Sequence, residues 1–198
     1  MHTPSRTVLV CAVAVSLMAT TVITASVNAQ SASTGSAATA APAQARDADP
    51  ADVASVDAIV RALYESISGP KGAPRDWARL RTLYGPNARM IYTTVGADGK
   101  GRLINWNVEE YIAAAGPGLM ANGFYEREIG RRTESFGNVT AIMSAYDSKF
   151  TLEDATPFQR GVNSIQLFYS GTRWYILSVM WDSERAGNPI PAKYLAPR

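Results

Sequence analysis

The sequence predicts an α+β domain in which helices come first and a meander of long strands follows. Residues 51–84 and 107–115 carry apolar side chains at helical spacing. The later part of the chain is rich in strand formers that are separated by turn residues. The four strand segments are 124–136, 139–152, 160–169 and 173–182. We therefore expect one strongly bent antiparallel (mixed) sheet that buries one face on three helices.

The first helix is predicted over residues 51–68 because apolar residues there recur every three or four positions. These residues are Val56, Val60, Leu63 and Ile67. Pro74 is well placed to open a second helix, because proline is tolerated in the first helical turn. Gly85 and Pro86 are expected to end that helix.

A short hairpin and a third helix are expected next. Residues 88–94 and 102–104 are strand formers on either side of Asp98-Gly99, which is a hairpin turn signal. Asn107 followed three residues later by Glu110 is typical of a capping box at a helix start. The Gly-Pro-Gly sequence at 116–118 is expected to end this helix.

Composition limits the classes of function. The chain has 198 residues, of which 46% are hydrophobic and 18% are charged, so it has enough apolar side chains for an ordinary globular domain. Its formal net charge of +2 gives no basis for electrostatic capture of a polyanion. We therefore expect no nucleic-acid partner.

The amino-terminal segment predicts export. Arg6 precedes an apolar stretch from Val8 to about Ala25, and small residues at 27–29 match a signal peptidase site. We expect residues 1–29 to be a signal peptide, so that the mature protein is periplasmic or extracellular and has no membrane anchor. Residues 30–50 are rich in alanine and serine and are expected to form a disordered linker. The domain is then expected over 51–187, with a proline-containing tail over 188–198.

Removal of that segment limits the available chemistry. The only histidine, His2, and the only cysteine, Cys11, both lie within it. A mature chain without them has no disulfide, no thiol nucleophile, no histidine base and no metal site that uses His or Cys ligands. We expect no metal and no cofactor, which leaves carboxylates, tyrosine, lysine, arginine, amides and hydroxyls for chemistry.

Three segments in this order resemble the SnoaL-like, nuclear-transport-factor-2-like superfamily. They are Phe-Tyr-Glu-Arg-Glu at 124–128, Phe-Gly-Asn-Val at 136–139 and Gly-Thr-Arg-Trp-Tyr-Ile at 171–176. The resemblance covers about residues 53–184. It implies a cone-shaped, cystatin-like roll of curved sheet closed by helices, with a pocket in its wide end and frequent homodimers through the outer sheet face. The superfamily includes isomerases, dehydratases, hydrolases and binding domains, so the fold alone does not select a function.

Candidate catalytic residues come from the strands. Strict alternation places Glu126, Glu128 and Arg132 on one face of the first long strand. Superfamily enzymes use an acid or base with a tyrosine or arginine partner, and the best set that this sequence offers adds Tyr146 to those three residues. A carboxylate base that works near neutral pH needs its pKa raised by burial.

Other residues are candidates for the pocket wall. Tyr92 and Trp106 lie near the short hairpin, and Asn163 and Gln166 alternate on the third long strand, so that only one of the two amides faces inward. Two functions follow. The first is an exported domain that binds a small apolar molecule, or a protein partner, without transforming it. The alternative is a cofactor-independent isomerase, dehydratase or hydrolase that uses a carboxylate base with tyrosine or arginine.

Overall fold

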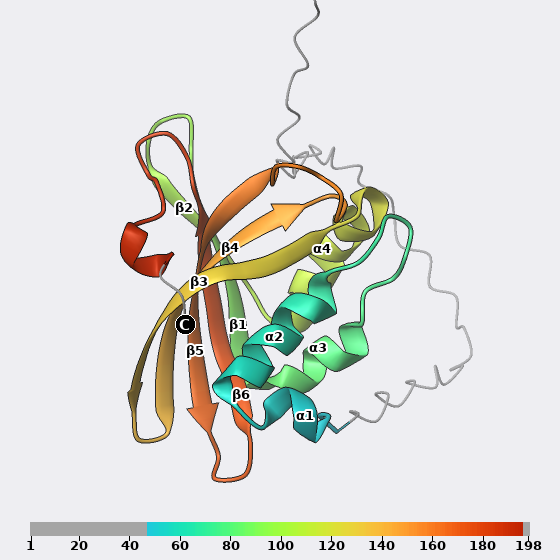
Figure 1. The fold of residues 1–198 in the computed structure, drawn as a ribbon, viewed down its shortest axis with the longest axis vertical. Coiled ribbons are helices and arrows are strands. Elements are labelled where there is room, and N and C mark those ends of the chain that lie inside the picture. Colours follow the sequence, from blue (N-terminus) through green and yellow to red (C-terminus); the bar gives the residue numbers. More distant parts are fainter. Residues whose placement is uncertain (1–46, 196–198) are drawn as a thin grey trace, which may run out of the picture. The chain divides into compact units, whose positions relative to one another are not determined.

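The computed structural model describes residues 47–195, which form four α-helices, a six-stranded sheet and a short 3-10 helix (Figure 1). The strand order is β2-β1-β6-β5-β4-β3. β1 runs parallel to β6, and the other neighbouring strands are antiparallel, so the sheet is mixed. This architecture confirms the predicted α+β fold class. The expected signal peptide and residues 30–46 of the expected linker lie outside the described residues.

The predicted first helix is two helices, α1 (Pro50–Val53) and α2 (Val56–Ile67). The break occurs because Ser55 has an extended backbone and its side chain accepts a hydrogen bond from the Ala58 N–H, which caps α2. The next helix, α3 (Trp77–Leu83), begins after Asp76, whose carboxylate caps it in the same way. It therefore starts three residues later than the position of Pro74 suggests.

The fourth helix, α4 (Val108–Asn122), does not end at Gly-Pro-Gly as predicted. It begins with the expected capping box of Asn107 and Glu110 but continues through Pro117. Near the end of this helix, the carbonyl of Leu119 accepts a hydrogen bond from the buried Arg75 guanidinium at 2.6 Å. This contact satisfies a backbone group at the helix end, where carbonyls lack partners within the helix.

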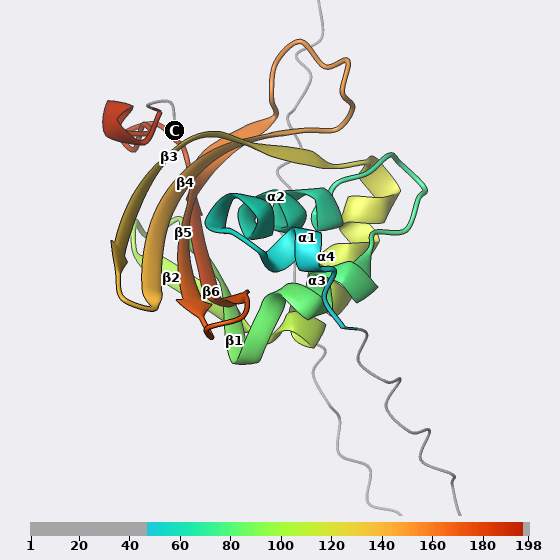
Figure 2. The same cartoon turned by 60° about the horizontal axis from the view of Figure 1, so that its bottom comes forward.

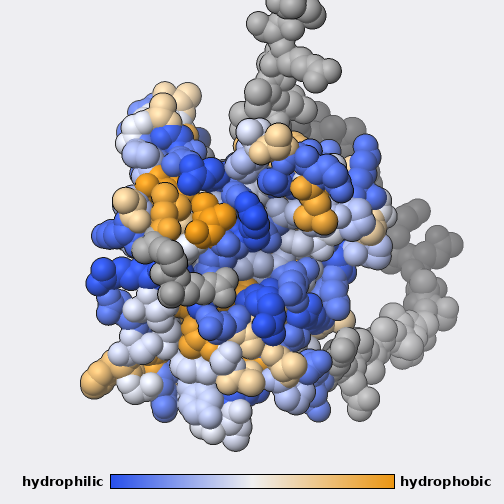
Figure 3. Space-filling model, viewed as in Figure 1, coloured by the Kyte–Doolittle hydropathy of each residue, from blue (hydrophilic) through white to orange (hydrophobic). Residues whose placement is uncertain are grey.

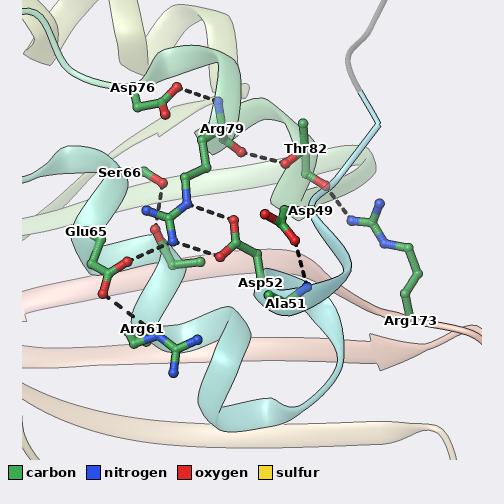
Figure 4. A network of polar contacts seen from close by, with 11 residues as sticks. Asp49, Ala51, Asp52, Arg61, Glu65, Ser66, Asp76, Arg79, Thr82 and Arg173 are labelled. Carbon is green, nitrogen blue, oxygen red and sulfur yellow. Dashed lines mark hydrogen bonds and ion pairs between the residues drawn. The ribbon is translucent and has the colours of Figure 1, made fainter.

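Ion pairs join the first three helices (Figure 4). The guanidinium of Arg79 on α3 donates two hydrogen bonds of 2.7 Å to the buried carboxylate of Asp52 on α1. It also donates a 2.7 Å hydrogen bond to Glu65 on α2. Bidentate pairing of this kind fixes orientation as well as distance. These ion pairs therefore link α1, α2 and α3 to one another.

The sheet contains one short strand and five long ones. β1 (Tyr84–Val95) and β2 (Gly101–Trp106) form the predicted hairpin. The meander consists of β3 (Tyr125–Phe136), β4 (Val139–Lys149), β5 (Gln159–Tyr169) and β6 (Trp174–Ser183). Each lies close to its predicted range, because alternation and turn residues mark strand ends well.

The sheet curves around α2, which lies against its concave face (Figure 2). The core forms between these layers and includes completely buried residues from both. They are Ile59, Leu80, Ile165 and Ile176. Buried apolar area of this kind supplies most of the stability of a domain. On the concave face the even-numbered residues of β4 and the odd-numbered residues of β5 point inward.

The segment after β6 covers part of the outer sheet face. It contains the 3-10 helix η1 (Ala192–Tyr194), which packs on β3 and β4. Ile190 in this segment is buried, and a second cleft of about 300 Å³ lies between the segment and the sheet. Apolar patches lie among hydrophilic side chains on the face drawn in Figure 3. The homodimer through the outer sheet face stays a prediction.

Candidate functional site

A cleft of about 420 Å³ lies between α2 and the edge strand β3. The end of β4 and Leu152 in the loop that follows complete its wall. Val60 and Tyr64 line it from α2, one helical turn apart, and Ser68 lines it from the position just after that helix. Glu126 and Glu128 line it from β3. A cleft of this volume is of the size that holds a small organic molecule.

Glu126 is held in the cleft by two hydrogen bonds from the sheet. Ser148, its direct neighbour on β4, donates to one carboxylate oxygen at 2.9 Å. The side-chain amide of Asn163 on β5 donates to the other oxygen at 3.4 Å. No lysine or arginine within residues 47–195 forms an ion pair with Glu126. The carboxyl is therefore oriented by neutral donors alone.

The surroundings of Glu126 raise its pKa to about 7. The main cause is burial, because the half-buried residue has lost most of the water that stabilises a charged carboxylate. The negative charge of Asp147 raises the pKa further, while the hydrogen bonds from Ser148 and Asn163 lower it. A carboxyl with this pKa is present in both protonation states near neutral pH, as a general acid or base must be.

Glu128 lies on the same face but in a different electrostatic environment. The guanidinium of Arg131 donates two hydrogen bonds of 2.8 Å to its two carboxylate oxygens. Both side chains are almost completely buried, with 3% of Glu128 and 6% of Arg131 exposed. Arg131 also pairs with Asp57 on α2 at 2.7 Å. This bidentate pairing makes Glu128 a structural partner of Arg131 rather than a base.

The structure does not bring Arg132 to the cleft. A β-bulge at Ile129 places one extra residue on β3, so that Glu128 lies opposite Tyr146 and Gly130 lies opposite Ala145. The bulge reverses the alternation beyond it, which turns Arg131 inward and Arg132 outward. Arg132 is exposed and pairs with Glu134 on the outer surface. The predicted inward position of Arg132 is therefore wrong, because strict alternation does not account for the inserted residue.

Tyr146 is buried on the concave face of β4, close enough to Glu126 for the two to interact electrostatically. Burial, together with the charge of Glu126, raises the pKa of the Tyr146 hydroxyl. Its ring fits against Gly161, where an added Cβ would lie 2.5 Å from the Tyr146 hydroxyl oxygen. Tyr146 is not part of the cleft wall itself.

The two amides of β5 have opposite positions. Asn163 is buried on the concave face, where it contacts Glu126 and Tyr64. Gln166 lies three residues further along on the outer face. The sequence left this choice open, and the register of β5 against β4 decides it in favour of Asn163.

Tyr92 and Trp106 belong to an aromatic cluster beside the cleft. The ring of Tyr92 lies 5.7 Å from that of Trp181, and the ring of Trp106 lies 6.3 Å from it. Tyr111 from α4 contacts both tryptophans edge-on. Aromatic packing of this kind fills space between helix and sheet. These residues therefore support the concave face and do not line the cleft.

Sequence analysis missed Tyr64, Ser144, Ser148 and Arg131 as members of the site. Tyr64 is four residues after Val60, so the helical stripe already placed it on the inward face of α2. The two serines alternate with Tyr146 on β4 and share its face. Only Arg131 gives no signal in the sequence, because the bulge is required to turn it inward.

Two kinds of feature are not found among residues 47–195. No three histidine, cysteine, aspartate or glutamate side chains in that range converge on a point where they could hold a metal ion. No helix there is long and apolar enough to cross a membrane.

Comparison with solved structures finds several matches at low sequence identity. A Nostoc punctiforme protein of unknown function with a cystatin-like fold matches with 10% identity and a TM-score of 0.50, over 66% of this chain and 90% of that one. An NTF2-like protein of unknown function from Shewanella baltica matches with 18% identity and a TM-score of 0.42, over 64% and 91%. A putative dehydratase of the NTF2-like family from Streptomyces avermitilis matches with 14% identity and a TM-score of 0.48, over 68% and 96%.

The match at a TM-score of 0.50 shows the cystatin-like fold that the resemblance implies. No protein-family model matches the chain, and no curated protein matches it. Similarity at these identities concerns the fold, so the function has to be argued from the cleft.

Proposed function

We propose that the cleft between α2 and β3 binds a small neutral molecule and that Glu126 takes a proton from it. The single observation that carries this proposal is a carboxyl in the cleft with a pKa near 7 and no cationic partner within residues 47–195. Glu128, two residues away and paired with Arg131, is the internal contrast. The reaction class is cofactor-independent isomerisation or dehydration.

The contacts of Glu126 support a role as base. In its charged form it accepts a proton from a carbon next to a carbonyl group, while Ser148 and Asn163 keep its oxygens in place. Isomerisation follows when Glu126 exchanges this proton with solvent and returns a proton to a different carbon. Dehydration follows when the proton leaves with a hydroxyl group as water. Both outcomes regenerate the starting protonation state of Glu126.

Binding without turnover is the second candidate, and the cations of the cleft wall favour it. Arg127 pairs with Asp147 at 2.9 Å, and Lys149 donates a hydrogen bond to a backbone carbonyl at 2.6 Å. Arg61 lies 3.8 Å from Glu65. Each cation thus already contacts an acceptor, whereas an enolate formed by proton removal needs a donor of its own.

Hydrogen–deuterium exchange separates the two candidates without knowledge of the product. The protein is incubated in D₂O with a panel of small neutral ketones, enones and β-hydroxy ketones, and deuterium gained at carbon is measured by mass spectrometry. We expect exchange with at least one class, and we expect Glu126→Gln to reduce it by about 100-fold or more. Glu134→Gln is the matched control, because Glu134 is an exposed carboxylate on the same strand.

Two results contradict the proposal. Exchange that persists in Glu126→Gln excludes Glu126 as the base. A panel member that binds tightly by native mass spectrometry, yet gains no deuterium in the wild-type protein, supports binding without turnover.

A further inference from the structure

A chain of hydrogen bonds runs through the buried interior from the Glu128–Arg131 pair to Glu126. It begins where the Ser144 hydroxyl donates to Glu128 at 2.6 Å. The Ser144 oxygen then lies 2.7 Å from the Tyr64 hydroxyl, which in turn lies 3.0 Å from the amide nitrogen of Asn163. The cross-strand register brings these groups together, since Ser144 lies opposite Arg131 on one side and opposite Asn163 on the other.

The direction of each hydrogen bond follows from counting protons. Glu128 accepts two bonds from Arg131, and a carboxylate in that state only accepts. Ser144 has one hydroxyl hydrogen and gives it to Glu128. Tyr64 must therefore donate in its contact with Ser144, which leaves the Tyr64 oxygen as an acceptor for Asn163.

The last link of the chain reaches the cleft. An amide whose nitrogen is held toward Tyr64 also turns its nitrogen toward Glu126, at 3.4 Å from the carboxylate. We infer that Asn163 is a positioning residue, and that the Glu128–Arg131 pair, acting through Ser144 and Tyr64, fixes the Asn163 N–H group as a donor to Glu126. This inference rests on the proposed role of Glu126, which it deepens. It also means that the Tyr64 hydroxyl hydrogen is committed to Ser144 and is not offered to a ligand.

Several ionisable groups interact electrostatically with Glu126. Tyr64 on α2, Tyr111 on α4 and Tyr146 on β4 interact with it electrostatically, and so does the carboxylate of Asp147. Burial and Asp147 raise the pKa of Glu126, whereas the Asn163 hydrogen bond lowers it. The chain of hydrogen bonds therefore keeps the pKa of Glu126 close to neutral pH, in a site that otherwise favours the protonated carboxyl.

Substitution of Ser144 tests this inference at a distance from Glu126. Without the Ser144 acceptor, nothing fixes the direction of the Tyr64 hydroxyl, and the Asn163 amide is free to turn its oxygen toward it. The experiment follows the Glu126 side-chain carboxyl by carbon-13 NMR as a function of pH in the full chain. We expect Ser144→Ala to raise the pKa of Glu126 by about half a pH unit or more.

Three further variants make the result interpretable. Ser66→Ala is the matched control, because Ser66 is an equally buried serine that bonds only within its own helix; we expect no change in the pKa. Tyr64→Phe removes the middle link and serves if Ser144→Ala does not fold. Asn163→Ala removes the donor itself and gives the full effect. An increase in Asn163→Ala with none in folded Ser144→Ala or Tyr64→Phe overturns the inference, as does an equal increase in Ser66→Ala.

This measurement uses no ligand, so its outcome is independent of the exchange experiment. Failure to find deuterium exchange refutes the proposed reaction but leaves the hydrogen-bond chain intact. If the pKa of Glu126 is unchanged in the Ser144 and Tyr64 variants, the proposed chain of hydrogen bonds is refuted, but Glu126 remains a candidate base.

Discussion

The raised pKa of Glu126 predicts a specific dependence of folding stability on pH. In the unfolded chain a glutamate has its ordinary pKa of 4.5, whereas in the folded protein that of Glu126 is about 7. Between these values the folded carboxyl holds a proton that the unfolded one has released. Stability therefore contains a contribution that is fully present below pH 4.5 and is lost as the pH rises through 7.

The size of this contribution follows from the two pKa values. Each pH unit between them corresponds to about 1.4 kcal/mol, so the loss from below pH 4.5 to well above pH 7 approaches about 3 kcal/mol. From about pH 5 to about pH 8 the expected loss is about 2 to 3 kcal/mol. Glu109 and Asp154 have lowered pKa values, so their contributions change at more acidic pH, outside this window.

Urea unfolding at several pH values, followed by tryptophan fluorescence, measures this effect. From pH 5 to pH 8, the free energy of unfolding of the wild type should fall by about 2 to 3 kcal/mol relative to that of Glu126→Gln, because glutamine does not titrate. Glu134→Gln, an exposed carboxylate, should follow the wild type. If the difference between wild type and Glu126→Gln is the same at every pH, the carboxyl is not desolvated and its assignment as a base loses its support.

Two further predictions concern the strand that carries the site. Arg131→Met removes the bidentate guanidinium from the buried Glu128 carboxylate and should lower the free energy of unfolding by about 3 to 5 kcal/mol. Arg132→Met should change it by less than about 0.5 kcal/mol, and equal effects of the two substitutions would contradict the bulge. Gly130→Ala puts a Cβ within 2.5 Å of the Tyr194 carbonyl oxygen and should release the C-terminal segment to limited proteolysis. Gly101→Ala, where a Cβ meets no atom within 4 Å, should leave the cleavage rate unchanged.

The elements of the fold could be predicted because their signals are local. Apolar spacing gave the helices, and alternation between turn residues gave the long strands to within a few residues. The break between α1 and α2 and the start of α3 follow from local caps at Ser55 and Asp76, whereas the end of α4 involves a distant group. α4 passes through Pro117, and Arg75, more than forty residues earlier in the chain, binds a carbonyl near its end. No local pattern contains that contact.

The site was predictable in part for the same reason. Glu126 and Asn163 could be proposed from alternation, because the strand segments that carry them keep their period of two. The choice between Asn163 and Gln166 needed the register of β5, which depends on pairing across the sheet. Arg132 was chosen instead of Arg131 because a bulge adds one residue without changing the composition of the strand.

The bulge at Ile129 gives Glu126 and Glu128 different environments. In a regular strand Arg131 would point to the outer face, and Glu128 would stay buried without its bidentate partner, at a cost of several kcal/mol. The bulge brings the guanidinium inward and holds Glu128 as a fixed acceptor. Glu126 lies before the bulge and beyond the reach of that pairing, so its carboxyl is contacted by neutral donors and keeps a pKa near 7. The local geometry of β3 therefore gives one glutamate a structural role and leaves the other free to exchange a proton.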